Sequence, residues 1–505
     1  MTAIQKLPAL NIELGGAALS ASDARTLREL RVQQRLSLPA LCELTFIDSP
    51  RQLAETSVVG TPLRITTKES AELFSGEITA VQHVYDPRRG EELRLRGYDL
   101  LHRLRKRQPV RAHVQLTLAD LFNELLADSG VTVDAAEAGP LWQRLIQYRH
   151  SDFALAAELA ERCGLYFTLR ENVLHLFTLK GEGDEVPLEL GKSLLEARIE
   201  VNADSSCSSV STTGWDPLRV EQHSGKAASA RSGREVSAEA GPELVGGEGE
   251  RSLVDETLQD DRQAEAIAQA ELDLHAAGEV VLWGVAEFDN KLRPGATVNV
   301  KGVARQLAGK YVLTAVDHTV DSEKGFVSTI STAPPAAARR NTHATAALGI
   351  VTHVNDPEGL GRVRLKLPTF EDVETDWLCV LTAGAGMGKG LLALPDVNDT
   401  VLVLFPHGDP AQGVVLGGLY GTERGPNWDW GIDEEAVKRY TFITSGGQKL
   451  RLDDSKKLIR LENSDGSYVE LAPERVLLHA ATDLQLEAPG RRVIVKGQAI
   501  DFQQS

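Results

Sequence analysis

The C-terminal end of the chain carries the pattern that most restricts its fold. From Leu450 onward, apolar residues come in pairs with one residue between the two members, and the pairs recur about every 7 to 10 positions. A spacing of two places both members on one face of a strand. Each unit can bury only one or two side chains, so a single copy of this segment cannot form a core. The pattern therefore predicts several identical chains wound together around a common axis, as a stiff rod with a polar surface.

The residues predicted to pack on this axis are the apolar positions in the middle of the repeat. They are Ile459, Leu461, Val469, Leu471, Leu484, Val493 and Val495.

Composition limits the remaining possibilities. A chain of 505 residues predicts several domains, and 44 glycines with 5% aromatic residues favour strands and turns over a helical bundle. The formal net charge of −18 disfavours a nucleic-acid partner, because such proteins depend on a basic field. No apolar run approaches the roughly 20 residues that span a bilayer, and no signal peptide is visible. The four cysteines lie far apart, without metal-ligand spacing.

Strand patterns in the first 335 residues alternate with three helical patterns. The first helix is expected to begin at Thr117, with Asp120 in capping-box position, and the second at Ser151. The third is "DDRQAEAIAQAELDLHAAG", and a hairpin turn is expected at Glu171-Asn172. Residues 221–262 are small, polar and poor in core-forming side chains, which predicts a long loop or a mobile excursion.

About 75 residues from Gly349 contain five short strand patterns, which is typical of a closed barrel of OB type. One of them, "GRVRLKLP", alternates cations with aliphatic residues, and the aliphatic residues are predicted to face the barrel core. These core residues are Val363, Leu365 and Leu367. The cations between them are expected to face outward, solvated or paired with carboxylates of neighbouring modules; they are Arg362, Arg364 and Lys366. OB sites for nucleic acid use stacking aromatic residues, and this strand has only Phe370 just beyond it.

Three patterns suggest chemistry, but each favours a structural interpretation. The glycine-rich residues 383–390 lack the Gly-Lys-Ser/Thr ending of a phosphate loop, so a barrel loop is expected. Paired carboxylates can cleave glycosidic bonds, but the acidic residues 429–435 lie in a short polar connector. The 12 histidines are scattered, although His479 could form a metal site if three copies met on an axis. We predict no catalytic residue, no cofactor and no metal ligand, and hence no enzyme.

Four ordered segments resemble the tail hub–spike proteins of contractile injection systems. This family includes phage baseplate hub–spikes, the VgrG proteins of type VI secretion and the spikes of extracellular contractile injection particles. The segments are "FSGEITAVQHVYD" with "LRLRGYDLLHRLRKRQPVR", then "LWQRLIQYRHSDFALAAELAERCGLYFTLRENVLHLF", then "STTGWDP", and finally "GIVTHVNDPEGLGRVRLKLP" with "DTVLVLFPHGDPAQGVVLGGLYG". The resemblance covers nearly the whole chain except residues 221–262.

The resemblance implies a mainly β fold with some α. It comprises two hub β-barrel domains with inserted helices, an OB barrel, and a C-terminal triple-stranded β-helix needle formed as a homotrimer. The expected boundaries are 1–110 for the first hub barrel, 111–335 for the inserted helices and second hub barrel, 336–346 for a linker, 347–421 for the OB domain, 422–438 for a connector and 439–505 for the spike.

The function implied by the resemblance is structural. The trimer would dock a hexameric inner tube through pseudo-sixfold barrels, contact baseplate proteins and pierce a target envelope, touching the membrane only transiently. A PAAR-like tip protein would contact Ile500 and Phe502. The chain would be made in the cytoplasm and assembled into a phage tail-like particle, with an extracellular injection particle preferred over a type VI VgrG or a phage hub. A cell-wall hydrolase on a tail scaffold and an OB-type nucleic-acid or sugar binder are the other hypotheses.

Overall fold

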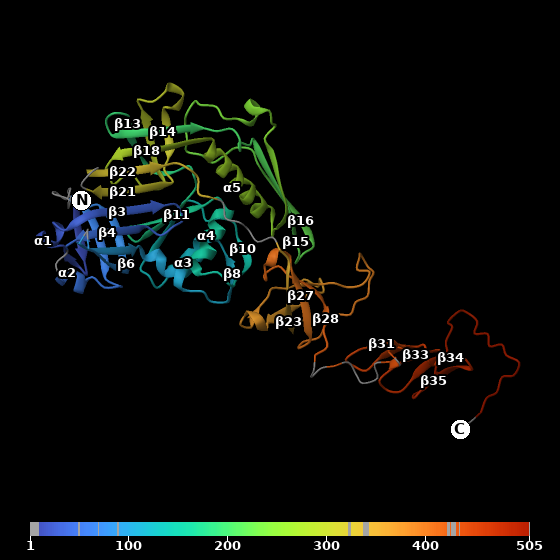
Figure 1. Cartoon of the computed structure of the whole chain (residues 1–505). Helices are drawn as coiled ribbons and strands as arrows, with labels where there is room; N and C mark the ends of the chain where they lie inside the picture. Colours follow the sequence, from blue (N-terminus) through green and yellow to red (C-terminus); the bar gives the residue numbers. More distant parts are fainter. Residues whose placement is uncertain are drawn as a thin grey trace. The chain divides into compact units, whose positions relative to one another are not determined.

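The computed structural model describes residues 10–48, 51–68, 70–87, 90–321, 325–336, 343–421, 425, 431–433 and 435–503. The chain divides into two compact units, Met1–Leu419 and Tyr420–Ser505 (Figure 1). Parts of the predicted linker (337–342) and connector (422–424, 426–430 and 434) lie outside the described residues, as do Asp429 and Glu434 of the acidic segment. No helix among the described residues is long and apolar enough to cross a membrane.

One sheet runs through the larger unit and joins strands from the two ends of the hub region. Within the described residues it has 11 strands, in the order β14-β18-β22-β21-β3-β4-β7-β6-β5-β1-β2. The two sets meet where β21 (Ala315–Asp321) pairs antiparallel with β3 (Leu27–Arg35), so blue and yellow strands lie side by side in Figure 1. The other strands are β1 (Leu10–Leu14), β2 (Ala17–Ala18), β4 (Leu41–Ile47), β5 (Pro62–Thr67), β6 (Glu72–Asp86), β7 (Gly90–Tyr98), β14 (Leu194–Val201), β18 (Val280–Glu287) and β22 (Gly325–Ser331).

Alternating side chains explain why this sheet forms. In β4, Cys42, Leu44 and Phe46 are fully buried, and the residues between them are partly exposed. A period of two places every apolar residue of the strand on the core face, which also fixes its register. The buried residues of β3, β4 and β7 form one core cluster, and those of β18, β21 and β22 contribute to a second cluster farther along the sheet.

The three predicted helices are confirmed. α3 (Leu118–Leu126) begins after Thr117, which forms a reciprocal capping box with Asp120. α4 (Asp152–Arg162) begins after Ser151, whose hydroxyl accepts a hydrogen bond from the Ala154 amide, and α5 (Asp261–Glu279) follows later in the chain. The apolar faces of α3 and α4 pack together with residues of β11 (Tyr166–Arg170) and β12 (Val173–Phe177) in a third core cluster. Smaller elements around them are η1 (Leu100–Lys106), β8 (Arg111–Leu116), β9 (Thr132–Ala135), β10 (Trp142–Gln147), β13 (Glu182–Glu189), β19 (Ala296–Lys301) and β20 (Gly309–Val312).

The predicted hairpin turn is also confirmed. β11 and β12 pair antiparallel through Arg170 and Val173, which leaves Glu171 and Asn172 as the two turn residues. Their φ angles are 49° and 61°. Two positive φ angles match the type I′ turn that suits the twist of a two-residue hairpin.

The prediction of a long loop over residues 221–262 is wrong at its two ends but matches residues 228–249, which carry no named strand and only the short 3₁₀ turn η2 (Pro242–Val245). β15 (Ser209–Asp216) pairs with β16 (Glu221–Ala227) on one side and with β17 (Glu250–Thr257) on the other. Small residues here permit close packing. A Cβ on Gly214 would lie 2.1 Å from the Glu256 carbonyl oxygen, and one on Gly225 would lie 2.3 Å from the Glu265 nitrogen in α5. Gly225 therefore reflects a close approach of β16 to α5, whereas the small, polar residues 228–249 do form a connection without strands.

The OB barrel follows the hub within the larger unit. Its sheet has the order β25-β24-β23-β27-β28-β26 within the described residues. The bounds are β23 (Thr345–His353), β24 (Arg364–Leu367), β25 (Val373–Glu374), β26 (Cys379–Val380), β27 (Thr400–Phe405) and β28 (Val414–Gly418), with short 3₁₀ turns η4 (Pro368–Phe370) and η5 (Pro406–Gly408). Val363, Leu365 and Leu367 are fully buried in the core of this barrel.

The expected outward position of Arg362 is wrong. Its side chain is only 5% exposed and forms a bidentate pair with Asp356, which is 2% exposed. The guanidinium holds the pKa of the Asp356 carboxyl well below its usual range. Asp356 also accepts from the amides of Glu358 and Leu360, so the pair closes the loop before β24. The other two cations pair within their own module: Arg364 lies beside Glu374 and Asp376, and Lys366 beside Asp372.

The smaller unit contains an antiparallel meander. Its strands are β31 (Arg439–Ile443), β32 (Lys449–Asp453), β33 (Leu458–Glu462), β34 (Tyr468–Ala472) and β35 (Arg475–His479), which pair in chain order. Two shorter strands, β29 (Ile432–Asp433) and β30 (Ala436–Val437), precede it. No strand is assigned in the described residues after His479. The first half of the predicted needle thus pairs its strands within one chain.

Replacement of Arg362 by Met should destabilise the OB barrel by about 3–5 kcal/mol, because the buried Asp356 carboxylate loses its partner. The matched variant Lys366→Met removes a cation that is 42% exposed, and should change stability by at most about 1 kcal/mol. Hydrogen exchange of the β24 and β27 amides measures the effect locally. Equal protection in the two variants would contradict the structural role assigned to Arg362.

Candidate functional site

The described residues contain no group of three or more His, Cys, Asp or Glu side chains that could hold a metal ion. Cys42, Cys163 and Cys207 are buried free thiols and Cys379 is partly buried. Burial raises the pKa of the Cys42 thiol far above its ordinary value, so this thiol is held protonated and unreactive. His479 stacks on Tyr468, with ring centroids 4.9 Å apart.

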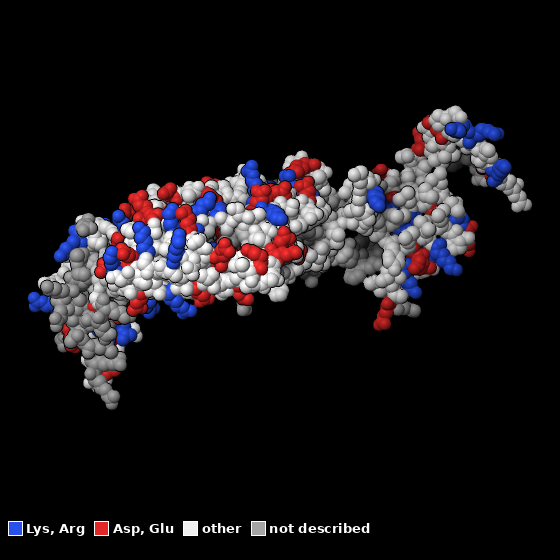
Figure 2. Space-filling model, turned by 90° about the horizontal axis from the view of Figure 1, so that it is seen from above, with Lys and Arg blue, Asp and Glu red and all other residues white. Residues whose placement is uncertain are grey.

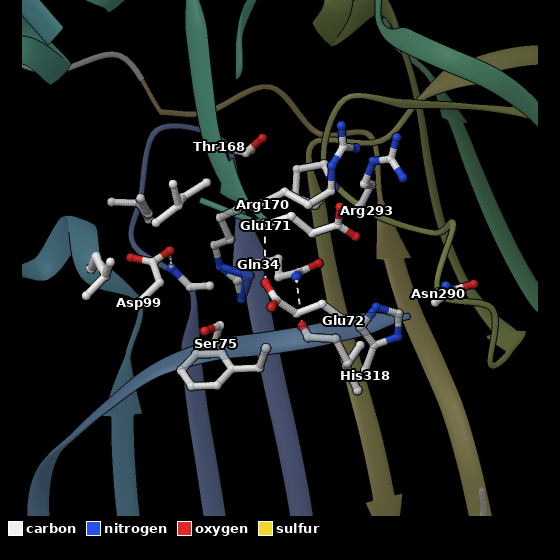
Figure 3. Close-up of a pocket in the computed structure, with 18 of the residues that line it drawn as sticks. Gln34, Glu72, Ser75, Asp99, Thr168, Arg170, Glu171, Asn290, Arg293 and His318 are labelled. Atoms are coloured by element: carbon white, nitrogen blue, oxygen red, sulfur yellow. Dashed lines mark hydrogen bonds between the residues drawn. The ribbon is translucent and has the colours of Figure 1, made fainter. Parts of the chain in front are cut away.

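A small polar cavity lies between the main sheet and the β11–β12 hairpin (Figure 3). Arg170 and Arg293 reach it from one side, and Glu72, Asp99 and other residues complete the wall. The cavity volume is about 60 Å³. Pockets for small-molecule ligands usually measure about 300–1,000 Å³, so this cavity has room only for a few water molecules.

The Asp99 carboxylate at this cavity has a structural contact on each oxygen. One oxygen accepts from the Ala40 amide at 2.8 Å and the other from the Leu101 amide at 3.0 Å, which starts η1. Burial raises the pKa of Asp99 to about 7, against the lowering effect of these two hydrogen bonds. The carboxyl group therefore holds together the β3–β4 turn and the "YDLLHRL" segment.

A larger hollow of about 640 Å³ has mainly apolar walls, with Phe153, Tyr166 and Trp283 among its lining residues. Its charged groups are Arg35, Glu161 and Asp317. Arg35 lies 3.5 Å from Asp317, so these two charges neutralise each other. The hollow therefore lacks the converging polar groups of an active site.

Charge on the molecular surface is mixed. On the face of the larger unit seen in Figure 2, Lys and Arg side chains alternate with Asp and Glu side chains, without a broad patch of either sign. The face seen there shows no basic stripe of the kind that nucleic-acid-binding proteins carry, and the net charge of −18 disfavours such binding as well.

The tail meander has one apolar face. The pairing register places Leu450 opposite Leu461, Leu452 opposite Ile459, Leu461 opposite Val469, and Val469 opposite Leu478. These residues therefore form rows across neighbouring strands on one side of the sheet. The opposite side carries charged residues such as Arg460 and Glu470, which form an ion pair at 3.1 Å. We call the apolar side the tail face; its members are Tyr440, Phe442, Leu450, Leu452, Ile459, Leu461, Val469, Leu471, Val476 and Leu478.

The tail face is exposed to solvent in the single chain. Its side chains range in exposure from 38% for Val469 to 73% for Val476. Four of the predicted axis residues lie on it: Ile459, Leu461, Val469 and Leu471. The other three, Leu484, Val493 and Val495, lie in the segment after β35 and are between 56% and 65% exposed. The tail face also includes Tyr440 and Phe442, which the predicted repeat from Leu450 onward did not contain although they show the same spacing of two.

The predicted tip residues and the glycine-rich loop are also exposed. Ile500 is 50% exposed and Phe502 94% exposed. In the glycine-rich loop, Met387 is fully exposed, and Gly386 and Lys389 form an isolated bridge with no helix after them.

Comparison with known protein families identifies the family to which the chain belongs. The sequence profile of the Alg8 N-terminal domain matches residues 58–322, which is more than half of the 505-residue chain. The chain belongs to the Alg8 N-terminal domain family. Residues 347–420 of this Alg8-family chain match the type VI secretion system/phage-baseplate injector OB domain.

Two solved structures share the fold of most of this chain. The Escherichia coli c3393 protein, described as a type VI secretion component similar to the T4 tail proteins gp27 and gp5, superposes with a TM-score of 0.54 at 13% identity, over 81% of this chain and 99% of that one. A chain of the lidded Francisella PdpA–VgrG complex gives a TM-score of 0.53 at 8% identity, over 93% of this chain and 79% of that one. The predicted resemblance to VgrG-like hub–spike proteins and the mainly β fold with an OB barrel are confirmed. The Escherichia coli protein is described as a component of the type VI secretion system, and at these identities both superpositions show a shared fold.

The titration of Asp99 should appear in the stability of the hub. Its raised pKa means that the folded hub binds a proton that the unfolded chain releases between about pH 4 and 7. The contribution of this group to stability therefore falls as the pH rises through that range. Between pH 4.5 and 7, the free energy of unfolding of the wild type should fall by roughly 2–4 kcal/mol more than that of Asp99→Asn. Urea denaturation at the two pH values measures this difference. Parallel pH profiles would contradict this assignment.

Proposed function

We propose that the chain is the structural hub and spike of a contractile injection apparatus and acts as a homotrimer. The tail face is the observation that carries this proposal. Ten apolar side chains on one side of a five-stranded sheet stay exposed in a single chain. Monomeric proteins rarely expose a contiguous apolar surface of this kind, so other copies of the chain are expected to cover it.

Three copies of the meander can bury their tail faces against one another around a common axis. The charged side of each sheet then faces solvent, where Arg460 pairs with Glu470 and covers Tyr468 at 3.7 Å from the ring centroid. Hydrogen bonding between neighbouring strands of each sheet and an apolar axis would make the assembly resistant to bending. Residues 439–479 would form this three-sided assembly of sheets. The following segment to Phe502 would continue it with strands that pair between chains, as in a triple-stranded β-helix.

The hub is proposed to dock the hexameric inner tube. Its two barrel regions contribute to one continuous sheet, so three chains would present six related regions to a sixfold ring. Baseplate proteins would surround this ring. At the other end, the 94% exposed Phe502, with Ile500, would contact a PAAR-like tip protein.

The mechanism is mechanical. Contraction of a sheath would push the trimer through the envelope of a target cell, and the spike would touch the membrane only briefly. The protein would be made in the cytoplasm and then assembled into a phage tail-like particle. We favour an extracellular injection particle; a type VI VgrG or a phage hub is the alternative, and imaging of the particle that contains the chain decides between them.

Val469→Asp and Val493→Asp test the trimer. Each would place three carboxylates together near an apolar axis, where burial of like charges is very costly. Light scattering after size exclusion should give three times the chain mass of 54.8 kDa for the wild type and one chain mass for these variants. Thr441→Asp adds the same charge to the opposite side of the meander and should remain trimeric. A wild-type monomer, or a trimeric and equally heat-resistant Val469→Asp, would contradict the proposal.

The rival hypothesis of a cell-wall hydrolase predicts a different result. Purified protein should leave peptidoglycan intact in a zymogram. Glu29 and Glu43 line a hollow of about 650 Å³, but Glu43 pairs with Arg96 at 3.1 Å and is therefore unsuited to act as the acid or nucleophile of glycoside cleavage. A zone of clearing that survives further purification would favour the hydrolase.

A further inference from the structure

Three of the contacts between the hub and the OB barrel join separate parts of the barrel. The first is Leu218, which follows β15 in the hub. Its side chain is 8% exposed and belongs to the OB core cluster, together with Leu365, Val403 and Val415. The Cys379 thiol of the barrel donates to the Leu218 carbonyl oxygen at 3.2 Å. A hub residue therefore completes the core of the barrel.

The "STTGWDP" segment positions Leu218. Its glycine, Gly214, allows β17 to approach the backbone, where a Cβ would clash with Glu256. Its aspartate, Asp216, is buried and accepts a hydrogen bond from the Leu218 amide at 2.7 Å. This turn directs Leu218 away from the hub sheet and into the barrel.

Tyr148 makes the second contact. Its ring lies 5.5 Å from that of Phe370 in an edge-to-face arrangement, and its hydroxyl donates to the Gly408 carbonyl oxygen. Gly408 has a φ of +76°, and a Cβ there would lie 3.7 Å from the Tyr148 hydroxyl. The loop that carries Tyr148 is fixed by Gln147, whose amide donates to Asp152 at 2.9 Å.

Arg144 makes the third contact. Its guanidinium donates to the Glu374 carbonyl oxygen at 2.9 Å and lies 3.8 Å from the Asp376 carboxylate. The side chain is only 10% exposed. Because β10 carries Arg144 and leads directly to Tyr148, one hub strand holds two separate elements of the barrel, β25 and η5.

We infer that Leu218, Tyr148 and Arg144 join the hub and the OB barrel into one mechanical body. Three contacts on different elements of the barrel resist both tilting and rotation, whereas a covalent linker alone would permit both. Separation would expose Leu218 and open the barrel core. In this view, the "STTGWDP", "QYRHSD" and "HGDP" segments are all parts of one joint, and force applied to the hub reaches the far end of the barrel without a hinge at this boundary.

The joint can be tested in the full chain by cutting the covalent link. A protease recognition sequence in place of residues 337–342 allows cleavage, which a denaturing gel verifies. The two fragments should then elute together from a sizing column under native conditions. Separation of the fragments in native buffer would overturn the inference.

Variants identify the residues responsible. In the cleaved protein, Leu218→Asp should release the C-terminal fragment, while Leu244→Asp should not, because Leu244 is 57% exposed in η2 (Pro242–Val245) and lies outside the OB core cluster. If Leu218→Asp does not fold, Tyr148→Ala decides the question: the fragments should separate at a lower urea concentration than in the cleaved parent. Equal behaviour of Tyr148→Ala and the parent would overturn the role of Tyr148. The inference does not rest on the proposed trimer. Co-elution of the two fragments reports attachment to the hub, and the mass of the C-terminal fragment reports the oligomeric state separately.

Discussion

The exposed tail face is the constraint on which the account of this protein depends. Backbone hydrogen bonds satisfy the meander within one chain, but they leave an entire row of aliphatic and aromatic side chains in water. Burial of apolar surface contributes roughly 25 cal/mol per Å², so the association of identical faces is strongly favoured. The charged opposite side keeps the association limited, since only one side of each sheet is apolar. In the proposed trimer, stiffness and oligomeric state would have the same physical origin.

The contacts between the hub and the OB barrel fix a second boundary between modules of the chain. A spike that transmits force needs each module to be fixed to the next. Leu218 supplies an apolar anchor, while Tyr148 and Arg144 add directional contacts to backbone carbonyls. The Asp356–Arg362 pair closes the barrel loop nearby, and Arg219 of the hub lies 3.4 Å from Glu358 in that loop. These contacts come from segments that precede the barrel by more than a hundred residues.

The sequence predicted the elements whose signals are local. Thr117 with Asp120, and Ser151, marked helix starts because caps act within one turn, and the alternation around Leu365 identified a barrel strand. The sequence-based prediction failed where a residue contacts another that is not its neighbour on the same strand or helix, or where one residue type suits two kinds of structure. Small, polar residues in 221–262 suggested one long loop, which holds for residues 228–249, but composition does not reveal that β16 and β17 pair with β15 at the two ends of the segment. Arg362 was expected outside, since the spacing of two does not show that Asp356 neutralises it. Leu218 had no local signal at all.

An image of the purified chain at a resolution that separates strands tests the central claim most directly. The account predicts three copies related by a threefold axis, with Ile459, Leu461, Val469 and Leu471 turned toward that axis and Arg460 on the outside. A single chain whose tail sheet stands alone in solvent, or a symmetric assembly with the charged side of the sheet on the axis, would contradict it.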